Sequence, residues 1–367
     1  MVDENKGRRM RELIELTKTL MTFRTMHSRP EEIRRCADFI ESYLRNIPVT
    51  VQRMDCQGIP SLWVIPTKGR VPVLLMSHID VVDAPEFLFE PQERDGRLYG
   101  RGSIDDKYAV ALSMTLLKEH MQELAGQGVS QDALPFGILI TGDEEVGGYR
   151  GARAALPHIP ADFAIALDGG SFTEIIVKEK GIVRLRLTAR GKTAHGARPW
   201  LGVNAIEILM EDLLAVKRLF AVETDDHWHR TMNIGIVRGG SSINQVPDMA
   251  EAHLDIRYTE NDDPKALVEA VRCLVRSHVD VLEQEPLFFG EAAGPVETLM
   301  RLVPEARLGR AHGASDARFL SQFGIPGIVW GADGEQSQHA EDEHVIIDSL
   351  VQLYETLRRF LRLVGRI

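Results

Sequence analysis

The sequence has few cysteines, and their placement limits the chemistry that they can support. Only Cys36, Cys56 and Cys273 occur among 367 residues. They are odd in number and far apart, so we expect neither a disulfide framework nor a paired-cysteine metal site. Unpaired thiols are typical of the reducing cytosol, where they are buried or chemically idle. The cysteines therefore predict a cytoplasmic protein.

Long apolar runs and an excess of positive charge are missing as well. Even the run at residues 71–76 is far too short to span a bilayer, and residues 1–13 lack the apolar core of a secretory signal. The chain has 54 acidic against 43 basic residues, a net charge of −11. Because an acidic surface repels phosphate backbones, we expect no nucleic-acid partner and no membrane partner.

What is present is an ordinary globular composition, with 44% hydrophobic and 26% charged residues. The length allows one large or two medium domains. Continuous apolar stretches predict buried strands, and helical periodicity predicts helices between them. The main predicted strands are 49–54, 62–65, 71–76, 136–140, 163–167 and 327–331, and the main helices are 13–21, 33–44, 108–120 and 346–363. Buried strands mixed with helices indicate an α/β fold.

The pattern changes at about Gly181. Residues 183–189 alternate between apolar and polar, which is typical of a sheet with one solvated face. A helix at 203–219, strands at 233–237 and 250–258, a helix at 264–279 and a short strand at 286–289 are expected to follow. The order β-α-β-β-α-β is that of a split ferredoxin-like unit. We therefore predict a small α+β domain, residues 182–292, inserted into a larger domain made of residues 1–181 and 293–367.

Histidines and acidic residues gather at the ends of the predicted buried strands, where sites form in open α/β sheets. Five segments share this placement: 77–80 (SHID), 100–107 (GRGSIDDK), 141–145 (TGDEE), 168–170 (DGG) and 338–343 (QHAEDE). Each segment alone also fits a solvated loop. Together, however, their carboxylates would repel one another unless cations neutralised them. Histidine with carboxylate suits zinc or a similar divalent metal such as cobalt or manganese, so we predict a metal site.

These motifs resemble a known family of co-catalytic dizinc enzymes. It includes peptidase T, glutamate carboxypeptidase, aminoacylase, carnosinase and succinyl-diaminopimelate desuccinylase. The resemblance extends over nearly the whole chain, because His78-x-Asp80, GRGSIDDK, DEEVGG, DGG, GKTAHGARP, NQVP, GASDARF and His339 occur in family order. It implies a mixed-sheet zinc-peptidase catalytic domain, an inserted ferredoxin-like lid, and a homodimer formed through the lid.

The resemblance also implies a ligand set for two divalent metal ions, most simply zinc, with cobalt or manganese as alternatives. His78 and Asp168 would bind one ion, and Glu145 and His339 would bind the other. Asp105 would bridge the two ions. In relatives the peptide bond that follows the bridging aspartate is cis, so we expect a cis bond between residues 105 and 106.

Three further residues take catalytic roles by the same resemblance. Glu144 would be the general base toward a metal-activated water. Asp80 would accept a hydrogen bond from the second ring nitrogen of His78 and so set its tautomer. His195, in Thr-Ala-His-Gly, would stabilise the oxyanion, and in dimeric relatives this histidine reaches the partner subunit's site.

The resemblance identifies substrate contacts by position. Asn244 and Arg257 match lid positions that hold a substrate carboxylate, for which the planar guanidinium of arginine is suited. A salt bridge on the sheet surface is the alternative for Arg257. Gly313 and Ser315 lie in a segment that resembles the glycine-rich loop around the same carboxylate. Glu343 is expected to be a structural acid or one in the outer shell of the metal site.

Two departures from the family pattern bear on the substrate. Tyr108 follows Lys107 where relatives usually have glycine, and its ring is expected to narrow one side of the pocket. Asp168, in place of glutamate, is typical of family members that act from a free N-terminus. The segment GASDARFL, in contrast, resembles the corresponding segment of the desuccinylase, so the two features point to different substrates.

We therefore predict a hydrolase that cleaves the amide bond of di- and tripeptides. A deacylase of N-acyl amino acids or N-succinyl diamino acids is the alternative. A binding or scaffold protein on a decayed enzyme fold is a third possibility, although the sequence retains every expected ligand and the base.

Overall fold

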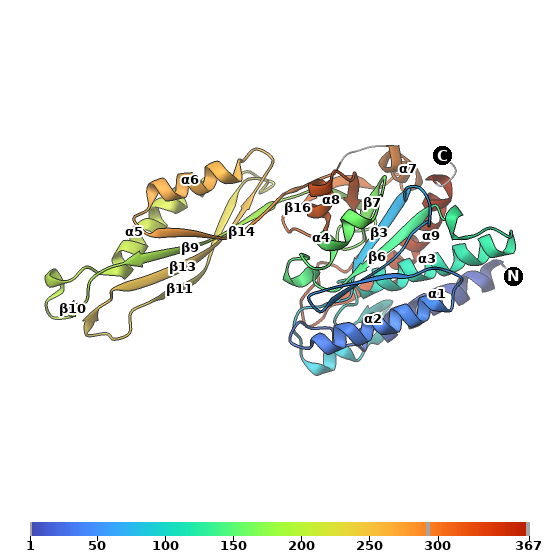
Figure 1. Cartoon of the computed structure of the whole chain (residues 1–367), viewed down its shortest axis with the longest axis horizontal. Coiled ribbons are helices and arrows are strands. Elements are labelled where there is room, and N and C mark those ends of the chain that lie inside the picture. Colours follow the sequence, from blue (N-terminus) through green and yellow to red (C-terminus); the bar gives the residue numbers. More distant parts are fainter. Residues whose placement is uncertain (1, 291–293, 365–367) are drawn as a thin grey trace. The chain divides into compact units, whose positions relative to one another are not determined.

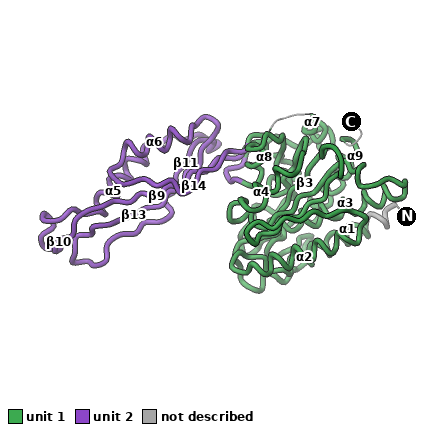
Figure 2. The backbone as a smooth tube through the Cα atoms, in the orientation of Figure 1, with its two compact units in different colours: residues 1–178, 289–310, 315–367 green, residues 179–288, 311–314 purple. Residues whose placement is uncertain are grey.

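The computed structural model describes residues 2–290 and 294–364, which divide into two compact units (Figure 2). Of the described residues, unit 1 holds those up to Lys178, Phe289–Arg310 and those from Ser315 onward, and unit 2 holds Glu179–Phe288 and Ala311–Ala314. The chain thus leaves unit 1 after residue 178 and returns to it at residue 289. The boundary predicted at 292/293 lies outside the described residues.

A nine-stranded mixed sheet forms the centre of unit 1 (Figure 1). The strands follow the order β1-β2-β6-β3-β7-β17-β8-β15, and β16 pairs with β8. The inner strands β6, β3, β7 and β17 are parallel to one another, whereas β2 and β8 pair with them antiparallel. The sheet confirms the predicted α/β class. Its strands are β1 (Gln52–Cys56), β2 (Ile59–Val64), β3 (Val73–His78), β6 (Phe136–Thr141), β7 (Ala164–Ala166), β8 (Glu174–Glu179), β15 (Phe288–Phe289), β16 (Arg307–Ala311) and β17 (Gly327–Val329).

Helices and a small second sheet complete unit 1. The helices are α1 (Val2–Met21), α2 (Pro30–Arg45), α3 (Lys107–Gly126), α4 (Ala152–Ala155), α7 (Gly294–Leu302), α8 (Ala317–Phe323) and α9 (Ile347–Val364). The small sheet has the order β18-β5-β4, from β18 (His344–Ile346), β5 (Arg97–Tyr99) and β4 (Gln92–Arg94). Helix α3 packs on β3 and β6 and is buried on all sides over residues 107–117. Among the described residues, no helix combines the length and the apolar character that crossing a membrane requires.

The inner strands determine where polar side chains can gather. All residues of β3 and β6 are buried, which explains why their sequences are apolar without alternation. The register pairs His78 at the end of β3 with Thr141 at the end of β6, and Met76 with Ala166 of β7. The segments that follow these strands therefore start from one edge of the sheet, the edge at which sites form in such folds.

Unit 2 contains an antiparallel sheet of order β11-β13-β9-β14, with α5 and α6 packed against it (Figure 1). Its main elements along the chain are β9 (Gly181–Arg190), α5 (Ala205–Lys217), β11 (Thr231–Gly239), β13 (Met249–Tyr258), α6 (Pro264–Leu274) and β14 (His278–Glu285). Strand β9 alternates between buried and more exposed residues, because one face packs on the helices and the other meets solvent. A separate two-stranded ribbon is formed by β10 (Ala194–His195), which follows β9 along the chain, and β12 (Gln245–Val246), which precedes β13.

The prediction for the end of unit 2 was wrong. The expected helix over 264–279 stops at Leu274, because Val275 already has an extended backbone. The fourth strand of the sheet is β14, in which Val279 pairs with Leu187 of β9. The expected strand at 286–289 instead supplies β15 to the sheet of unit 1. Apolar residues of α6 and β14 follow one another without a turn signal, so helical periodicity was extended past the end of the helix.

Candidate metal centre

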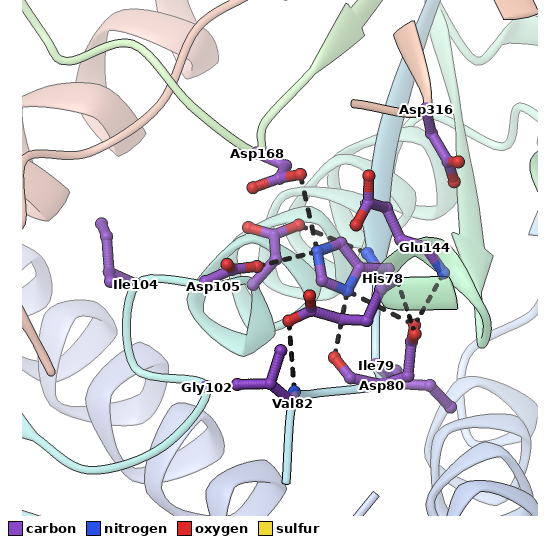
Figure 3. A network of polar contacts seen from close by, with 12 residues as sticks. His78, Ile79, Asp80, Val82, Gly102, Ile104, Asp105, Glu144, Asp168 and Asp316 are labelled. Carbon is purple, nitrogen blue, oxygen red and sulfur yellow. Dashed lines mark hydrogen bonds and ion pairs between the residues drawn. The ribbon is translucent and has the colours of Figure 1, made fainter. Parts of the chain in front are cut away.

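Histidine and carboxylate side chains from separate segments of unit 1 meet at the edge where the inner strands end (Figure 3). His78 is the last residue of β3, and Asp105 lies just before α3. His78 Nε2 lies 3.0 Å from Asp105 Oδ1 and 3.6 Å from Asp168 Oδ2. His339 Nε2 lies 3.1 Å from Asp105 Oδ2 and 3.2 Å from Glu145 Oε2. Asp105 therefore presents one oxygen to each histidine.

These side chains form two groups of potential metal donors. In one group, donor atoms of His78, Glu144 and Asp168 all lie within 4.8 Å of one another. In the other, donor atoms of Asp105, Glu145 and His339 do so. All five residues expected to bind metal are thus brought together, and Glu144, the expected general base, is also a potential donor in the first group.

The donor atoms fit divalent cations. Within the described part of the chain, the buried atoms His78 Nε2 and Asp105 Oδ1 have no hydrogen-bond partner, although they lie 3.0 Å apart. Such orphaned polar atoms are costly unless a shared partner satisfies them. Imidazole nitrogen with carboxylate oxygen is a donor set for zinc and similar metals. The residues present therefore fit two divalent ions.

The electrostatics of the protein without metal reflect the same crowding. Burial lowers the pKa of His78, but the carboxylates of Asp105, Asp168 and Asp80 outweigh burial and raise that pKa well above its usual value. Hydrogen bonds to Asp105 and Glu145 raise the pKa of His339 to about 10. Without metal, protonated histidines thus provide the positive charge that neutralises the carboxylates, a role that cations would otherwise fill.

Asp80 connects the two glutamates to the edge of the sheet. Its fully buried carboxylate accepts hydrogen bonds from the backbone N–H of Glu144 at 3.1 Å and of Glu145 at 3.0 Å. His78 Nδ1 lies 3.1 Å from the backbone carbonyl of Asp80 and 3.4 Å from its carboxylate. The expected contact between the His78 ring and Asp80 is therefore made at shorter range by the carbonyl than by the carboxylate.

His27 is a residue that the sequence did not single out. Its Nε2 lies 3.0 Å from Asp80 Oδ2, across 53 positions of the chain. Burial raises the pKa of Asp80, but hydrogen bonds with His27 and His78 outweigh it and bring that pKa to about 2. No motif surrounds His27, so only the contact itself identifies it.

A buried ion pair holds the loops that carry Asp105 and His339. The Glu343 carboxylate pairs with Arg101 and accepts the N–H of Gly102 at 2.8 Å. Arg101 also donates to the backbone carbonyl of His339 at 3.1 Å. Glu343 is thus a structural acid between the two loops. The peptide bond between residues 105 and 106 is cis, as predicted.

A small pocket adjoins His78, Glu144 and Asp168, and the loop before α8 contributes Ser315 and Asp316 to its lining. Asp316 is a second residue that the sequence reasoning missed, although it lies within GASDARF. Burial raises its pKa to about 7, against the opposing charge of Arg318. Arg318 in turn donates to the carbonyls of Ser315 and Gly147, both at 2.7 Å, and so ties this loop to the turn that carries the glutamates.

The other expected site residues belong to unit 2. His195 is the last residue of β10, and Asn244 lies in the turn just before β12, where its carbonyl accepts the N–H of Gly196 at 2.7 Å. His195 is exposed, and its Nδ1 accepts the N–H of Ala197 at 3.1 Å. Arg257 pairs with Asp255 at 2.6 Å on the sheet surface. Gly313 is exposed in the segment 311–314.

A mixed α/β sheet with two histidine–carboxylate groups at its strand ends is the arrangement of a metal-binding hydrolase. Residues 74–363 match the family described as Peptidase family M20/M25/M40, and the chain belongs to this family. The comparison confirms the predicted family.

Individual relatives agree with this assignment. A "Probable carboxypeptidase" of Arthroderma gypseum is 27% identical over 300 residues, which cover 73% of this chain and 63% of that protein. The chain thus spans less than two thirds of that relative's length. A "Peptidase M20 domain-containing protein" of Schizosaccharomyces pombe is 26% identical over 96% of this chain and 84% of its own length. The crystal structure of a Staphylococcus aureus tripeptidase shares the fold, with 22% identity, a TM-score of 0.78 and coverage of 98% and 99% of the two chains.

Proposed function

We propose that this protein is a dizinc metallopeptidase that hydrolyses the amide bond of di- and tripeptides. The observation that carries the proposal is the pair of histidine–carboxylate groups joined at Asp105. The names of relatives support a peptidase, since one is a tripeptidase and another a probable carboxypeptidase. The three unpaired cysteines support the cytoplasm as its location.

In this proposal the five ligands divide around Asp105. His78 and Asp168 would hold one ion, Glu145 and His339 would hold the other, and Asp105, which faces both histidines, would contact both. Two divalent ions at such a site polarise a carbonyl and make a water molecule more acidic. Zinc suits the mixed nitrogen and oxygen donors, and cobalt or manganese could replace it.

Glu144 is proposed as the general base. Its backbone N–H is fixed by Asp80, so the side chain starts from a defined position beside His78 and Asp168. Burial, together with the charges of Asp168 and Asp316, raises the pKa of Glu144 well above its usual value. A carboxylate with a raised pKa can take a proton from water and later pass it to the leaving amine.

His195 is proposed to stabilise the oxyanion in the partner subunit's site. Because Nδ1 accepts the N–H of Ala197, the proton of the neutral ring lies on Nε2, which is then a hydrogen-bond donor. Asn244, in the turn before β12, is proposed to contact the substrate, as are Arg257, Gly313 and Ser315. For Arg257 this requires the guanidinium to exchange or share its bond with Asp255.

A homodimer through unit 2 completes the proposal. Leu209 and Val216 of α5 are buried, whereas Met210 is 58% and Leu214 is 62% exposed. The edge strand β11 also exposes apolar side chains, with Val237 at 57%. An unpaired strand edge next to exposed apolar residues is a surface that a second copy could cover with two-fold symmetry.

The substrate class is tested with one panel of compounds and the purified protein. A tripeptide is offered free, N-acetylated and C-amidated, beside N-acetyl and N-succinyl amino acids, with zinc, cobalt or manganese added. We expect the free peptide to be cleaved and the N-acetylated peptide to resist, with the C-amidated peptide measuring how far turnover depends on the substrate carboxylate. The Glu144→Gln variant, purified in parallel, measures contaminating peptidases.

Other outcomes of the panel identify other activities. Cleavage of the N-acetylated but not the C-amidated peptide would indicate a carboxypeptidase. Preference for N-acetyl or N-succinyl amino acids would establish the deacylase alternative, which the GASDARF loop beside the metal centre favours. If the protein bound no metal and hydrolysed none of the compounds, the remaining hypothesis would be a binding or scaffold protein on a decayed enzyme fold.

A further inference from the structure

Tyr108 does not narrow the pocket, contrary to the expectation from its sequence. The ring is only 1% exposed and packs within the main hydrophobic cluster of unit 1. Its hydroxyl donates a hydrogen bond to the backbone carbonyl of Leu167 and accepts one from the backbone N–H of Ala332 at 3.0 Å. A side chain of α3 thus connects the segments that follow β7 and β17.

The packing around this hydroxyl is close. A Cβ atom at Gly331 would lie 2.4 Å from the Tyr108 hydroxyl oxygen and 2.7 Å from the Leu167 carbonyl oxygen. The backbone carbonyl oxygen of Gly169 would lie only 2.8 Å away as well, so position 331 requires glycine. Residue 331 therefore lies close both to the phenol and to the backbone on either side of Asp168.

The bonded carbonyl belongs to the peptide unit that leads directly into Asp168. A peptide unit is planar, so a hydrogen bond on the Leu167 oxygen also orients the nitrogen of Asp168. On the other side, Gly169 and Gly170 have φ angles of +135° and +67°. The peptide unit before Asp168 is thus fixed by a hydrogen bond. The two residues after Asp168 are glycines, the most conformationally permissive residues.

We infer that Tyr108 is a positioning residue for Asp168, acting through the Leu167 carbonyl. The inference rests on the proposed function, in which Asp168 binds metal. By holding the backbone, the phenol keeps the carboxylate directed at His78, whose Nε2 lies 3.6 Å from Asp168 Oδ2. The alternative is that Tyr108 is a structural residue, a buried aromatic ring whose hydroxyl makes its hydrogen bonds and contributes only to stability.

The test is the Tyr108→Phe variant, which keeps the ring and removes only the hydroxyl. Apoprotein is titrated with Zn²⁺ in competition with a chromophoric chelator, and its unfolding temperature is measured without metal. Residues that orient metal ligands typically contribute about 10–100-fold to affinity. We expect one ion to bind about 10–100-fold more weakly and the other to bind as in the wild type, because Asp168 belongs to one donor group.

Tyr354→Phe is the matched control. Tyr354 is also a fully buried tyrosine of unit 1, and its hydroxyl contacts Glu119, which is in neither donor group. This variant should bind both ions as the wild type does, whatever its stability.

The outcomes separate the inference from the proposed function. If wild-type apoprotein binds no Zn²⁺, the proposed function fails. If the wild type binds two ions and Tyr108→Phe binds both equally well, the positioning role is overturned while the function stands. Equal weakening of both ions, with a fall in unfolding temperature, would also overturn it in favour of a structural role.

Discussion

Glu144 and Glu145 are neighbours in the chain, but their side chains meet different partners. Glu145 Oε2 lies 3.2 Å from His339, whereas Glu144 stands with His78 and Asp168. We predict that Glu144→Gln retains two metal ions per chain but loses about 10²–10⁴ in turnover, the usual contribution of a general base. Metal content by elemental analysis and steady-state kinetics measure the two effects.

The ligand variants should show the opposite pattern. His78→Ala and Asp105→Ala should lower the metal content itself, because each removes a donor atom from one of the two groups. If Glu144→Gln also lost metal, Glu144 would be a ligand and the base would have to be sought elsewhere. Unchanged metal content in both alanine variants would contradict the ligand assignment.

Proton release on metal binding follows from the raised pKa of the two histidines. In the apoprotein the pKa of His339 is about 10, and that of His78 is also raised, so both rings are protonated at neutral pH. A metal ion needs the neutral ring, so binding expels these protons and affinity rises with pH up to the apoprotein pKa. We expect weaker Zn²⁺ binding at each lower pH between about 6.5 and 8.5.

Calorimetry in two buffers of different ionisation enthalpy measures the number of protons released. A binding constant that does not change with pH, with no proton release, would show that the histidines are neutral before metal arrives. His344→Gln is a useful control, because this buried histidine of β18 pairs with Glu335 and belongs to neither donor group.

At the scale of elements, the buried Glu343–Arg101 pair joins the loop before α3 to the loop before β18. Both side chains are almost fully buried, and burial raises the pKa of Glu343 to about 7, so above that pH removing one charge leaves the other unpaired. Breaking a buried pair in this way typically costs about 3–5 kcal/mol. We predict a loss of this size in the free energy of unfolding of Glu343→Gln, measured by denaturant titration.

Glu335→Gln provides the comparison for this prediction. Glu335 also pairs with an arginine, Arg97, and with His344, but the Glu335 side chain itself is 51% exposed. Exposed pairs contribute about 0–1 kcal/mol, so this variant should be nearly as stable as the wild type. Equal losses in the two variants would show that burial of Glu343 is not what makes its pair important.

At the scale of the whole molecule, the dimer proposal depends on the exposed face of α5. Leu214→Glu places a charge on a side chain that is 62% exposed, so the folded monomer should tolerate it. In a dimer interface over this face, however, the charge introduced at position 214 would be buried without a partner. We therefore predict that light scattering of the Leu214→Glu variant shows a 41.1 kDa monomer in place of the dimer. If His195 serves the partner subunit's site, activity should fall with the dimer.

Leu274→Glu on α6 is the matched control, because Leu274 is also an exposed leucine of unit 2, at 46%. It should leave both the mass and the activity unchanged. A fully active wild-type monomer at assay concentration would reject the dimer and the role of His195 in the partner subunit's site together.

Local sequence patterns determined much of the framework. The apolar run at 71–76, the helix expected at 108–120 and the one at 346–363 correspond to β3, α3 and α9, each within a few residues at the start. Such elements bury most of their length, and burial leaves a strong hydrophobic pattern in the sequence. The C-terminal end of α6 and the start of β14 leave no such pattern, so the predicted helix ran past Leu274.

The chemistry of the candidate site was also readable, because histidines and carboxylates at strand ends have few other reasons to accumulate there. What only the tertiary structure decided was which atoms meet. His27 reaches Asp80 and Tyr108 reaches Leu167 through contacts between segments far apart in the chain. The direction of a side chain such as Tyr108, into the pocket or into the core, depends on how neighbouring strands and helices pack. That packing is a property of the assembled fold, and no local pattern in the sequence encodes it.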